Sequence, residues 1–360
     1  MAPKEDSTNK GSLDQKFRLI ADSIRAYPAQ LKKAWGDISL MYLPDDYKNV
    51  DNVILCGMGG SALGARMIDS LIQDRLRIPF EIYTEYNIPN YVNAKSLAII
   101  SSYSGTTEET LNCFYQAINK GAKIFGLTTG NKLGEILIEN KIPGYLFDPL
   151  NNPSNQPRMA LGYSSGSILA LLAKLGFINV LQEELDDALE TMYELLGEIH
   201  EDVNEKNPAK NLALKISGYS PVLVSSEHLL GTSHAIKNQF NENAKTFAYL
   251  FDLPELNHHL MEGLQHPKKL KDYLKFIFIQ SDLYSAKVKV RYKITQEVVE
   301  KNGYETLIYT PNSDKKLSQI YELLIFGSYV NYFLTKLYKI DPIEIPWVDY
   351  FKDRLNSHSQ

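Results

Sequence analysis

The sequence predicts an α/β protein made of two doubly wound parallel sheets. Short apolar runs that end in glycine or hydroxyl residues recur along the chain, as at residues 53–56 and 96–101, and such runs are typical of buried parallel strands. Stretches with helical spacing of apolar residues separate them, so strands and helices alternate. A length of 360 residues suits two domains of this kind.

The first half begins with helical spacing of apolar residues over residues 13–47. Helices are also predicted at residues 61–74 and 107–119, each directly after a strand. The predicted strands of the first sheet are residues 53–56, 80–83, 96–101 and 123–128, with 144–147 as a candidate fifth.

A helix-rich stretch over residues 160–216 precedes the second half, and its acidic part at residues 182–205 is expected to be exposed. Two further helices are predicted at residues 228–241 and 315–338. The predicted strands of the second sheet are residues 221–225, 246–250, 275–280 and 306–310.

These elements predict five segments of the chain. The two sheets define two αβα sandwich domains, and no low-complexity linker separates them. The segments are an N-terminal helical segment (1–48), a first, phosphate-binding domain (49–175), a helical connector (176–204), a second domain (205–340) and a C-terminal segment (341–360).

Composition excludes several classes of protein. The net charge of −5 disfavours a nucleic-acid partner, which needs a basic face. Two cysteines, Cys56 and Cys113, cannot build a disulfide framework or a cysteine-rich zinc site. No apolar stretch matches a signal peptide or a membrane span, so we expect a cytoplasmic protein without a membrane partner.

Two loops carry the predicted chemistry. Gly57-Met58-Gly59-Gly60-Ser61 joins a strand to a helix, and its glycines let backbone N–H groups approach an anion at the helix N-terminus. The spacing matches neither a dinucleotide fingerprint nor a Walker loop. A simple tight turn is the alternative, and for this loop alone we weigh the two equally.

The second loop, residues 101–107, is rich in serine and threonine and also joins a strand to a helix. The alternative is that Thr106 and Thr107 only cap the helix. One cap needs a single hydroxyl, however, and this loop supplies an excess. Because both loops follow parallel strands, where open α/β sheets bind ligands, we predict one anion site built from the pair.

The two loops resemble the sugar isomerase (SIS) domain, and residues 50–355 resemble the bifunctional phosphoglucose/phosphomannose isomerase family. Further segments carry this narrower resemblance: Gln156-Pro157-Arg158, Asn241 to Lys245, Pro254 to His258, and Asp341-Pro342 through Phe351-Lys352. The resemblance implies two SIS-type domains and an isomerase that needs no metal or other cofactor. It also implies a sugar-phosphate substrate and a homodimer.

The resemblance further implies a role for each matched residue. Glu242 would move a proton between C1 and C2, and Arg158 would stabilise the enediolate. His258, contributed by the partner subunit, and Lys352 would assist opening of the sugar ring. The substrate phosphate would be held by Gly59, Gly60, Ser61, Ser102, Ser104 and Thr107.

These residue types suit an aldose–ketose isomerisation on chemical grounds as well. Removing a proton beside a carbonyl takes a positioned base, usually a carboxylate or a histidine. The developing oxyanion needs a cationic partner, which arginine supplies without losing its charge. The remote phosphate supplies binding energy that positions the sugar.

Alternatives remain at several positions. Without the resemblance, Glu242, Arg158 and Lys352 read as surface charges, and either His258 or His259 could face the sugar. Ile343 and Ile345 stand where members that accept mannose phosphate would carry small or hydroxyl residues, which favours glucose 6-phosphate as the substrate.

Two other functions compete with the isomerase. A non-catalytic sugar-phosphate regulator would use the same fold, but residues 1–48 are too few for an added DNA-binding domain with its linker. An amino-sugar-phosphate enzyme would need an amidotransferase segment, which the sequence lacks. In the second half, Glu227 follows the first strand where a phosphate would be repelled, so we predict one phosphate site per chain.

Overall fold

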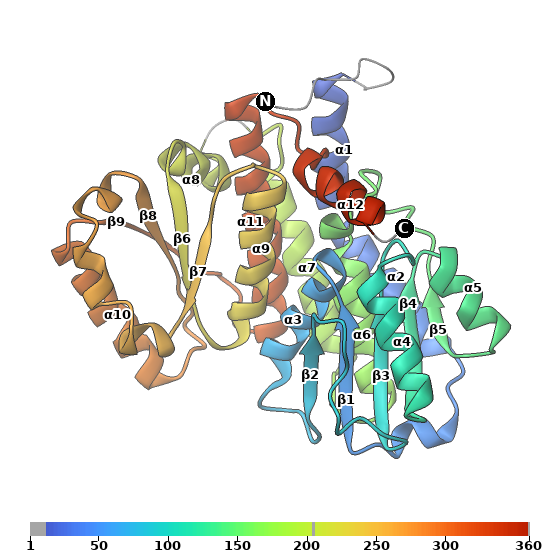
Figure 1. Ribbon diagram of the computed structural model, residues 1–360. Coiled ribbons are helices and arrows are strands. Elements are labelled where there is room, and N and C mark those ends of the chain that lie inside the picture. Colours follow the sequence, from blue (N-terminus) through green and yellow to red (C-terminus); the bar gives the residue numbers. More distant parts are fainter. Residues whose placement is uncertain (1–11, 204–205, 359–360) are drawn as a thin grey trace.

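The computed structural model describes residues 12–203 and 206–358, so most of the predicted N-terminal polar end lies outside the described residues. Two parallel sheets stand side by side with helices between them and on their outer faces (Figure 1). The predicted fold class, two doubly wound parallel-sheet domains, is confirmed. Within the described chain, no helix combines the length and the apolar character needed to cross a bilayer.

The first sheet has five parallel strands in the order β2-β1-β3-β4-β5. β1 and β3 lie side by side at its centre, and both are almost entirely buried, as their continuous apolar runs predict. The strands are β1 (Asn52–Gly57), β2 (Phe80–Tyr83), β3 (Ser96–Ser101), β4 (Lys123–Thr128) and β5 (Gly144–Leu146), and the helices that follow them are α3 (Gly60–Ile72), α4 (Glu108–Asn119) and α5 (Asn131–Glu139).

The second sheet has four parallel strands in the order β7-β6-β8-β9. The strand predicted at residues 246–250 begins three residues later in the structure, and the helix α10 was not predicted. The elements are β6 (Ser220–Ser225), α9 (Leu230–Glu242), β7 (Tyr249–Asp252), β8 (Leu274–Ile279), α10 (Ala286–Lys301) and β9 (Glu305–Tyr309).

The remaining helices surround and join the two sheets. Short 3-10 helices shape the loops, notably η2 (Pro157–Met159), η3 (Glu227–Leu229) and η4 (Glu255–His258), with η1 (Asp45–Lys48), η5 (Glu262–Gln265) and η6 (Lys268–Asp272) elsewhere. The α-helices are α1 (Leu13–Arg25), α2 (Tyr27–Leu40), α6 (Leu161–Lys174), α7 (Gln182–Ile199), α8 (Pro208–Ile216), α11 (Lys316–Tyr338) and α12 (Pro346–His358).

Helices α3, α9 and α11 lie between the two sheets (Figure 1). At the crossing of α3 and α9, a Cβ on Gly231 would lie only 1.8 Å from the carbonyl oxygen of Arg66, so only glycine permits this approach. α11 is buried on all sides for most of its length. Apolar residues of both sheets consequently share one continuous core, while the face of the first sheet under α4 and α5 has a second cluster of its own.

The acidic connector is only partly exposed. α7 buries Leu185, Met192 and Ile199 against its neighbours, while its acidic side chains line the opposite, solvent-facing side. The predicted limits of the five segments stay predictions, because the shared core gives no sharp boundary between them.

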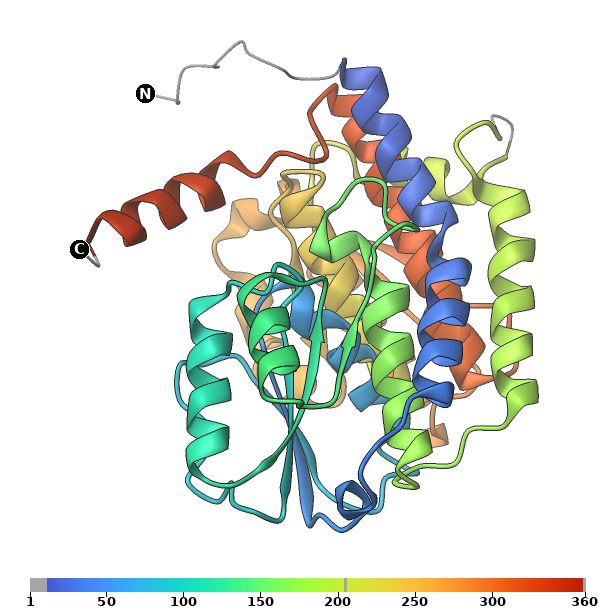
Figure 2. The ribbon, with the colours of Figure 1, turned by 90° about the vertical axis from the view of Figure 1, so that its right-hand side faces the viewer.

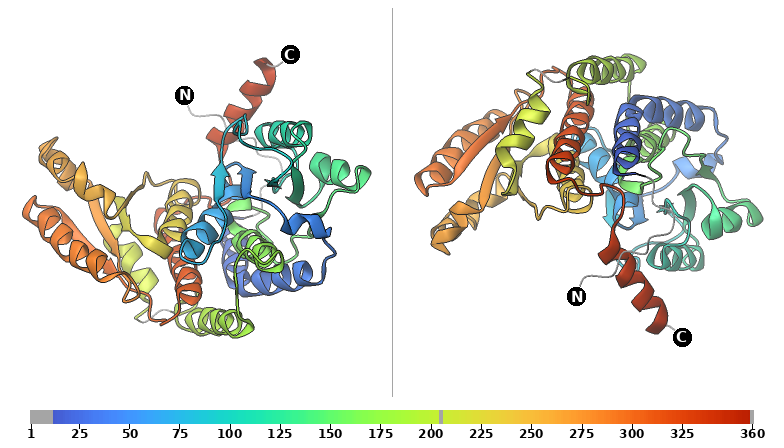
Figure 3. Two further views of the ribbon diagram at one scale, coloured as in Figure 1. Left: turned by 90° about the horizontal axis from the view of Figure 1, so that it is seen from below. Right: turned by 90° about the horizontal axis from the view of Figure 1, so that it is seen from above.

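The C-terminal helix α12 leaves the body of the molecule. It projects from one side of the fold in Figure 2, and the two views of Figure 3 show the same projection. The described side chains of α12 are exposed, including the apolar Trp347 and Phe351. This helix extends the chain well past Ile343, which lies at the edge of the core.

Candidate active site

The two predicted loops lie side by side at the carboxyl ends of β1 and β3. Gly57 pairs with Ser101 across these strands, so both loops start at the same level. The Ser101 hydroxyl donates to the Ser61 carbonyl at 2.8 Å, and the Tyr103 N–H donates to the Ser61 hydroxyl at 2.9 Å. These bonds make the loops one continuous structure at the edge of the sheet.

The helix N-termini that follow these loops have no side-chain caps. The N-cap residues are Gly59 for α3 and Thr107 for α4, and neither side chain bonds to the first turn of its helix. The Thr107 hydroxyl lies 2.9 Å from the buried Ser102 hydroxyl instead. The alternative that this loop only caps α4 therefore disagrees with the geometry, and two positive helix ends are directed toward one place.

Glycines allow the close approach of the chain segments here. A Cβ on Gly57 would lie 2.9 Å from the Ser101 carbonyl oxygen, and one on Gly60 would lie 2.8 Å from the Cβ of Pro157 and 2.9 Å from the backbone nitrogen of Arg158. Gly59 has a φ of +49°, which other residues rarely adopt. The contact at Gly60 places the predicted arginine directly beside the first loop.

Arg158 is buried, with 1% of its surface exposed. Its Nε donates to Asn243 Oδ1, and its Nη1 donates to Gln156 Oε1 at 2.7 Å. Its Nη2 donates to the carbonyl oxygens of Pro342 and Ile343 at 3.0 and 2.8 Å. Burial lowers the pKa of Arg158, with nearby carboxylates opposing the shift, but an arginine stays charged at neutral pH.

Glu242 is the last residue of α9 and lies beside this guanidinium. Its Oε2 is 3.4 Å from Arg158 Nη1, and the side chain keeps 29% of its surface exposed. A carboxylate that is accessible and held next to a fixed cation has the geometry of a general base beside an electrostatic stabiliser. The structure thus brings together two of the four predicted catalytic residues.

A turn near the C-terminus holds Arg158 in place. The Asp341 carboxylate accepts hydrogen bonds from the backbone N–H groups of Ile343 and Glu344, at 2.8 and 3.2 Å, and pairs with Lys16 of α1. This turn aims the carbonyl groups of Pro342 and Ile343 at the guanidinium. Lys16 also pairs with Glu344 at 2.8 Å, so the N-terminal helix supports the site through two ion pairs.

Lys245 is a site residue to which sequence reasoning gave no role. Its ammonium group donates to the carbonyl oxygens of Glu242 and Asp341, at 2.8 and 2.7 Å, and so ties the end of α9 to the C-terminal turn. Loss of solvent around the ammonium and the nearby Arg158 cation lower the pKa of Lys245 to about 8. Gln156, Asn243 and Asp341 were likewise quoted only as parts of motifs. Proximity in the sequence to Arg158 and Glu242 could have found Gln156 and Asn243, but Asp341 lies far from both in the sequence.

His258 and Lys352 lie apart from this pair. His258 is exposed on η4, beyond the edge strand β7 of the second sheet, and Lys352 is exposed on the projecting helix α12. Within residues 12–203 and 206–358, neither side chain forms a hydrogen bond or ion pair with Arg158 or Glu242. His259 is exposed as well, with its ring 6.2 Å from that of Phe251, so both histidines stay candidates.

A carboxylate follows β6, the strand of the second sheet that corresponds to β1, and another lies beside the segment after β9. Glu227 follows β6 and accepts from the backbone N–H of Ser285 at the start of α10, at 3.1 Å. Glu322 of α11 accepts from the N–H groups of Asn312 and Ser313 at 2.8 and 3.1 Å. The protein's own carboxylates thus satisfy backbone donors that a phosphate would need.

In the described part of the chain, no group of three or more histidine, cysteine, aspartate or glutamate side chains is arranged to hold a metal ion. The His258–His259 pair also lacks the spacing of a metal motif. The polar groups that the structure brings together here are the guanidinium of Arg158, the carboxylate of Glu242 and the loop hydroxyls and amides.

Comparison with known proteins gives a consistent result. The model of the bacterial phospho-glucose isomerase C-terminal SIS domain matches residues 205–355. The bifunctional phosphoglucose/phosphomannose isomerase of Caldicellulosiruptor bescii is 33% identical over 345 residues, which cover 93% of this chain and 98% of the relative. The protein of the same name from Aquifex aeolicus is 30% identical, covering 90% of this chain and 95% of its own.

Solved structures agree on the fold. A hypothetical protein from Thermus thermophilus superposes with a TM-score of 0.73 at 15% identity, covering 96% of this chain and 94% of the other. The C-terminal domain of a glucosamine-fructose-6-phosphate aminotransferase from Francisella tularensis gives a TM-score of 0.64 at 11% identity, covering 95% and 100%. At these identities the likeness concerns the fold alone.

Proposed function

Because this chain belongs to the bifunctional phosphoglucose/phosphomannose isomerase family, we propose that it interconverts glucose 6-phosphate and fructose 6-phosphate through an enediol intermediate. The single observation that carries this proposal is the Arg158–Glu242 pair, 3.4 Å apart and directly beside the loop of Gly60. This proximity supports the assignment of a base, a cation and a phosphate-binding loop to one site.

The phosphate binds at the two loops. Backbone N–H groups at the starts of α3 and α4, with the hydroxyl of Ser104, surround the anion without any lysine. Gly59 and Gly60 let the backbone come close. Ser61 braces the loops by accepting from the Tyr103 N–H, and Ser102 and Thr107 brace them through their bond to each other. Binding energy from this remote group positions C1 and C2 of the open sugar at the catalytic pair.

Proton transfer is the task of Glu242. Its carboxylate takes the proton from C2 of the aldose and returns it to C1, which gives the ketose, and the reverse reaction retraces these steps. Arg158 stabilises the negative charge that develops on the substrate oxygen. Since the guanidinium is already fixed by Asn243 and Gln156, little reorganisation is needed when that charge appears.

Ring opening precedes this step and needs a proton donor and acceptor at the ring oxygen and the O1 hydroxyl. We assign these roles to Lys352 and to His258 of a second copy, with His259 as the alternative imidazole. The exposed position of His258, away from Glu242 of its own chain, supports a contribution to the partner's site. The arrangement requires a homodimer.

A coupled assay tests the proposal. Fructose 6-phosphate is supplied without added metal, and the formation of glucose 6-phosphate is followed by reduction of NADP in the presence of glucose-6-phosphate dehydrogenase. We expect turnover that EDTA does not reduce. Binding of the sugar phosphate without turnover would instead favour the non-catalytic regulator.

The same assay, run with mannose 6-phosphate, tests the second hexose, because conversion through fructose 6-phosphate to glucose 6-phosphate gives the same signal. In the structure the backbone carbonyl of Ile343 faces Arg158, so the residue contributes to the site through its main chain. We expect activity on mannose 6-phosphate to be present but lower than on glucose 6-phosphate, because Ile343 and Ile345 offer no hydroxyl group to the sugar.

A further inference from the structure

A fully buried glutamine on α9, Gln239, holds the main chain of Arg158. Its Nε2 group donates to the Arg158 carbonyl oxygen at 3.1 Å. Asn243, which accepts from Arg158 Nε, lies four residues later, at the C-cap of the same helix. Positions four residues apart share one face of a helix. The end of α9 thus grips one arginine at two points, its main chain and its side chain.

Two hydroxyl groups fix the orientation of the Gln239 amide. Ser328 of α11 donates to its Oε1 at 2.9 Å, and Tyr27 of α2 accepts from its Nε2 at 3.2 Å. A serine hydroxyl has a single proton, so the tyrosine is the donor in the 3.3 Å contact between Tyr27 and Ser328. Burial raises the pKa of Tyr27 to about 12, so its proton stays on the oxygen at neutral pH. Each donor in this buried network therefore has an acceptor, and one N–H of Gln239 is directed at Arg158.

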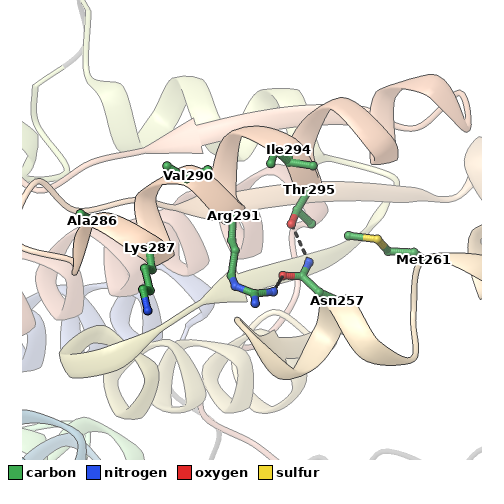
Figure 4. Close-up of a pocket in the computed structure, with 8 residues that line it drawn as sticks. All are labelled: Asn257, Met261, Ala286, Lys287, Val290, Arg291, Ile294 and Thr295. Carbon is green, nitrogen blue, oxygen red and sulfur yellow. Dashed lines mark hydrogen bonds between the residues drawn. The ribbon is translucent and has the colours of Figure 1, made fainter.

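A second arginine–asparagine bond shows what this arrangement adds. In the groove between η4 and α10, Arg291 donates to Asn257 Oδ1 at 3.0 Å, and Asn257 donates to Thr295 at 2.7 Å (Figure 4). Arg291 is partly exposed, however, and within residues 12–203 and 206–358 no side chain forms a hydrogen bond with its main chain. The grip on main chain and side chain together distinguishes Arg158 from Arg291.

We propose that Gln239 is a positioning residue for the isomerisation, because it fixes the main chain of Arg158 relative to Glu242. This inference rests on the proposed function. Glu242 is the last residue of α9, so the base and the anchor of the cation belong to one helix. The 3.4 Å separation between Glu242 Oε2 and Arg158 Nη1 then depends on the anchored main chain of η2 as well as on the arginine side chain. Without the anchor, η2 can shift against α9, and small displacements of a reacting group strongly reduce the rate.

Steady-state kinetics with fructose 6-phosphate test the role of Gln239. Gln239→Met removes the anchor but keeps a side chain of similar length. We expect kcat to fall by about 10- to 10²-fold. KM should stay within about twofold, because the phosphate-binding loops keep their contacts. An undiminished kcat overturns the proposal.

Gln319→Met is the matched control. Gln319 of α11 has 1% of its surface exposed and forms hydrogen bonds with His228, Ser281 and Ser313, none of which belongs to η2 or α9. Both glutamine variants should lower the free energy of unfolding, but only Gln239→Met should lower kcat. An equal fall of kcat in the two variants overturns the proposal, since a general loss of packing then explains it.

A double-mutant cycle shows whether Gln239 acts through Arg158. In the Arg158→Lys background, Gln239→Met should lower kcat by less than about twofold, because the guanidinium that it positions is gone. If the two changes instead multiply, Gln239 does not act through Arg158 and the proposal fails.

Hydrogen exchange at Arg158 Nε–H tests the positioning without any turnover. NMR identifies the resonance by its loss in Arg158→Lys, and its exchange with solvent should be about tenfold faster in Gln239→Met. Arg291 is the internal reference, and equal acceleration there would overturn the proposal. Unchanged exchange at Arg158 in an active enzyme refutes the positioning alone. Faster exchange at Arg158 in a protein whose unchanged form does not turn over fructose 6-phosphate refutes the proposed function alone.

Discussion

Arg158 Nη1 lies 3.4 Å from Glu242 Oε2, although 84 positions separate the two residues in the sequence. Glu242 is the last residue of α9, which follows β6 of the second sheet. Arg158 lies on η2, which follows β5 of the first sheet, so the pair connects the two halves of the molecule. Neither sheet alone contains both groups, so the proposed catalytic pair depends on the packing of α9 against α3 and η2.

Replacing Arg158 with lysine should cost activity even though the charge is kept. The guanidinium makes four hydrogen bonds in different directions, and an ammonium group on a flexible stem cannot reproduce them. We expect kcat to fall by about 10²- to 10³-fold, as for the loss of one stabilising donor in other enzymes. Steady-state kinetics with fructose 6-phosphate measure this. A kcat within a factor of two of the original enzyme would show that Arg158 is not the oxyanion partner.

Gly60→Ala should disturb the site through its backbone. The new Cβ would lie 2.8 Å from Pro157 and 2.9 Å from the nitrogen of Arg158, so α3 or η2 must move. We expect a loss of about 1–3 kcal/mol in the free energy of unfolding, as for overpacking elsewhere, together with lower kcat. Gly36→Ala in α2 is the matched control, since a Cβ there has open space. It should stabilise the protein by about 0.5–1 kcal/mol, and equal effects of the two changes would refute the close contact.

Ser104→Ala should weaken substrate binding with little effect on chemistry. Ser104 is exposed at the tip of the second loop, where its hydroxyl oxygen accepts from the N–H and the hydroxyl of Thr106 at 3.3 and 3.1 Å. Loss of one hydrogen bond to a charged phosphate should raise KM by about tenfold and leave kcat nearly unchanged. Ser39→Ala, at an exposed position in α2, should alter neither constant. An unchanged KM in the Ser104 variant would count against the proposed cradle.

The lowered pKa of Lys245 predicts how the stability of the protein depends on pH. Its pKa is about 8 in the folded protein and about 10.4 in an unfolded chain. Between these values the unfolded state binds more protons, so the contribution of this group to stability rises as the pH increases. Chemical denaturation of the original protein and of Lys245→Met at pH 8 and pH 10 measures this contribution to the free energy of unfolding. The difference in unfolding free energy should shift in favour of the original protein at pH 10, and a constant or opposite difference would contradict the lowered pKa.

The central strands of the first sheet could be predicted well because a strand buried on both faces needs a continuous apolar run, which is visible in the local sequence. The apolar runs that form β1, β3 and β4 are buried on both faces, and the structure places them within one residue of the predicted limits. α10 escaped prediction for the opposite reason. Val288, Val290, Tyr292 and Ile294 alternate with charged residues, which is a strand-like period, and only packing against η4 and the sheet makes the segment helical.

The parts of the candidate site that lie in a single loop could be predicted from the sequence. The parts that depend on contacts between distant segments could not. Spacing after β1 and β3 was enough to predict that the two loops adjoin. The support of Arg158 by Asn243 and the Asp341 turn depends on tertiary contacts far apart in the sequence. The separation of His258 from Glu242 is also invisible to any local pattern.

Exchange of substrate hydrogen with solvent tests the central claim most directly. The original enzyme and Glu242→Gln are each incubated with glucose 6-phosphate in D₂O, and NMR follows deuterium at C2 of the aldose and C1 of the ketose. Glu139→Gln, at an exposed position on α5, is the control. An enediol mechanism with Glu242 as base predicts incorporation by the original enzyme and the control, and a rate about 10²- to 10⁴-fold lower in Glu242→Gln although sugar phosphate still binds. Isomerisation without deuterium incorporation, or undiminished incorporation by Glu242→Gln, would contradict it.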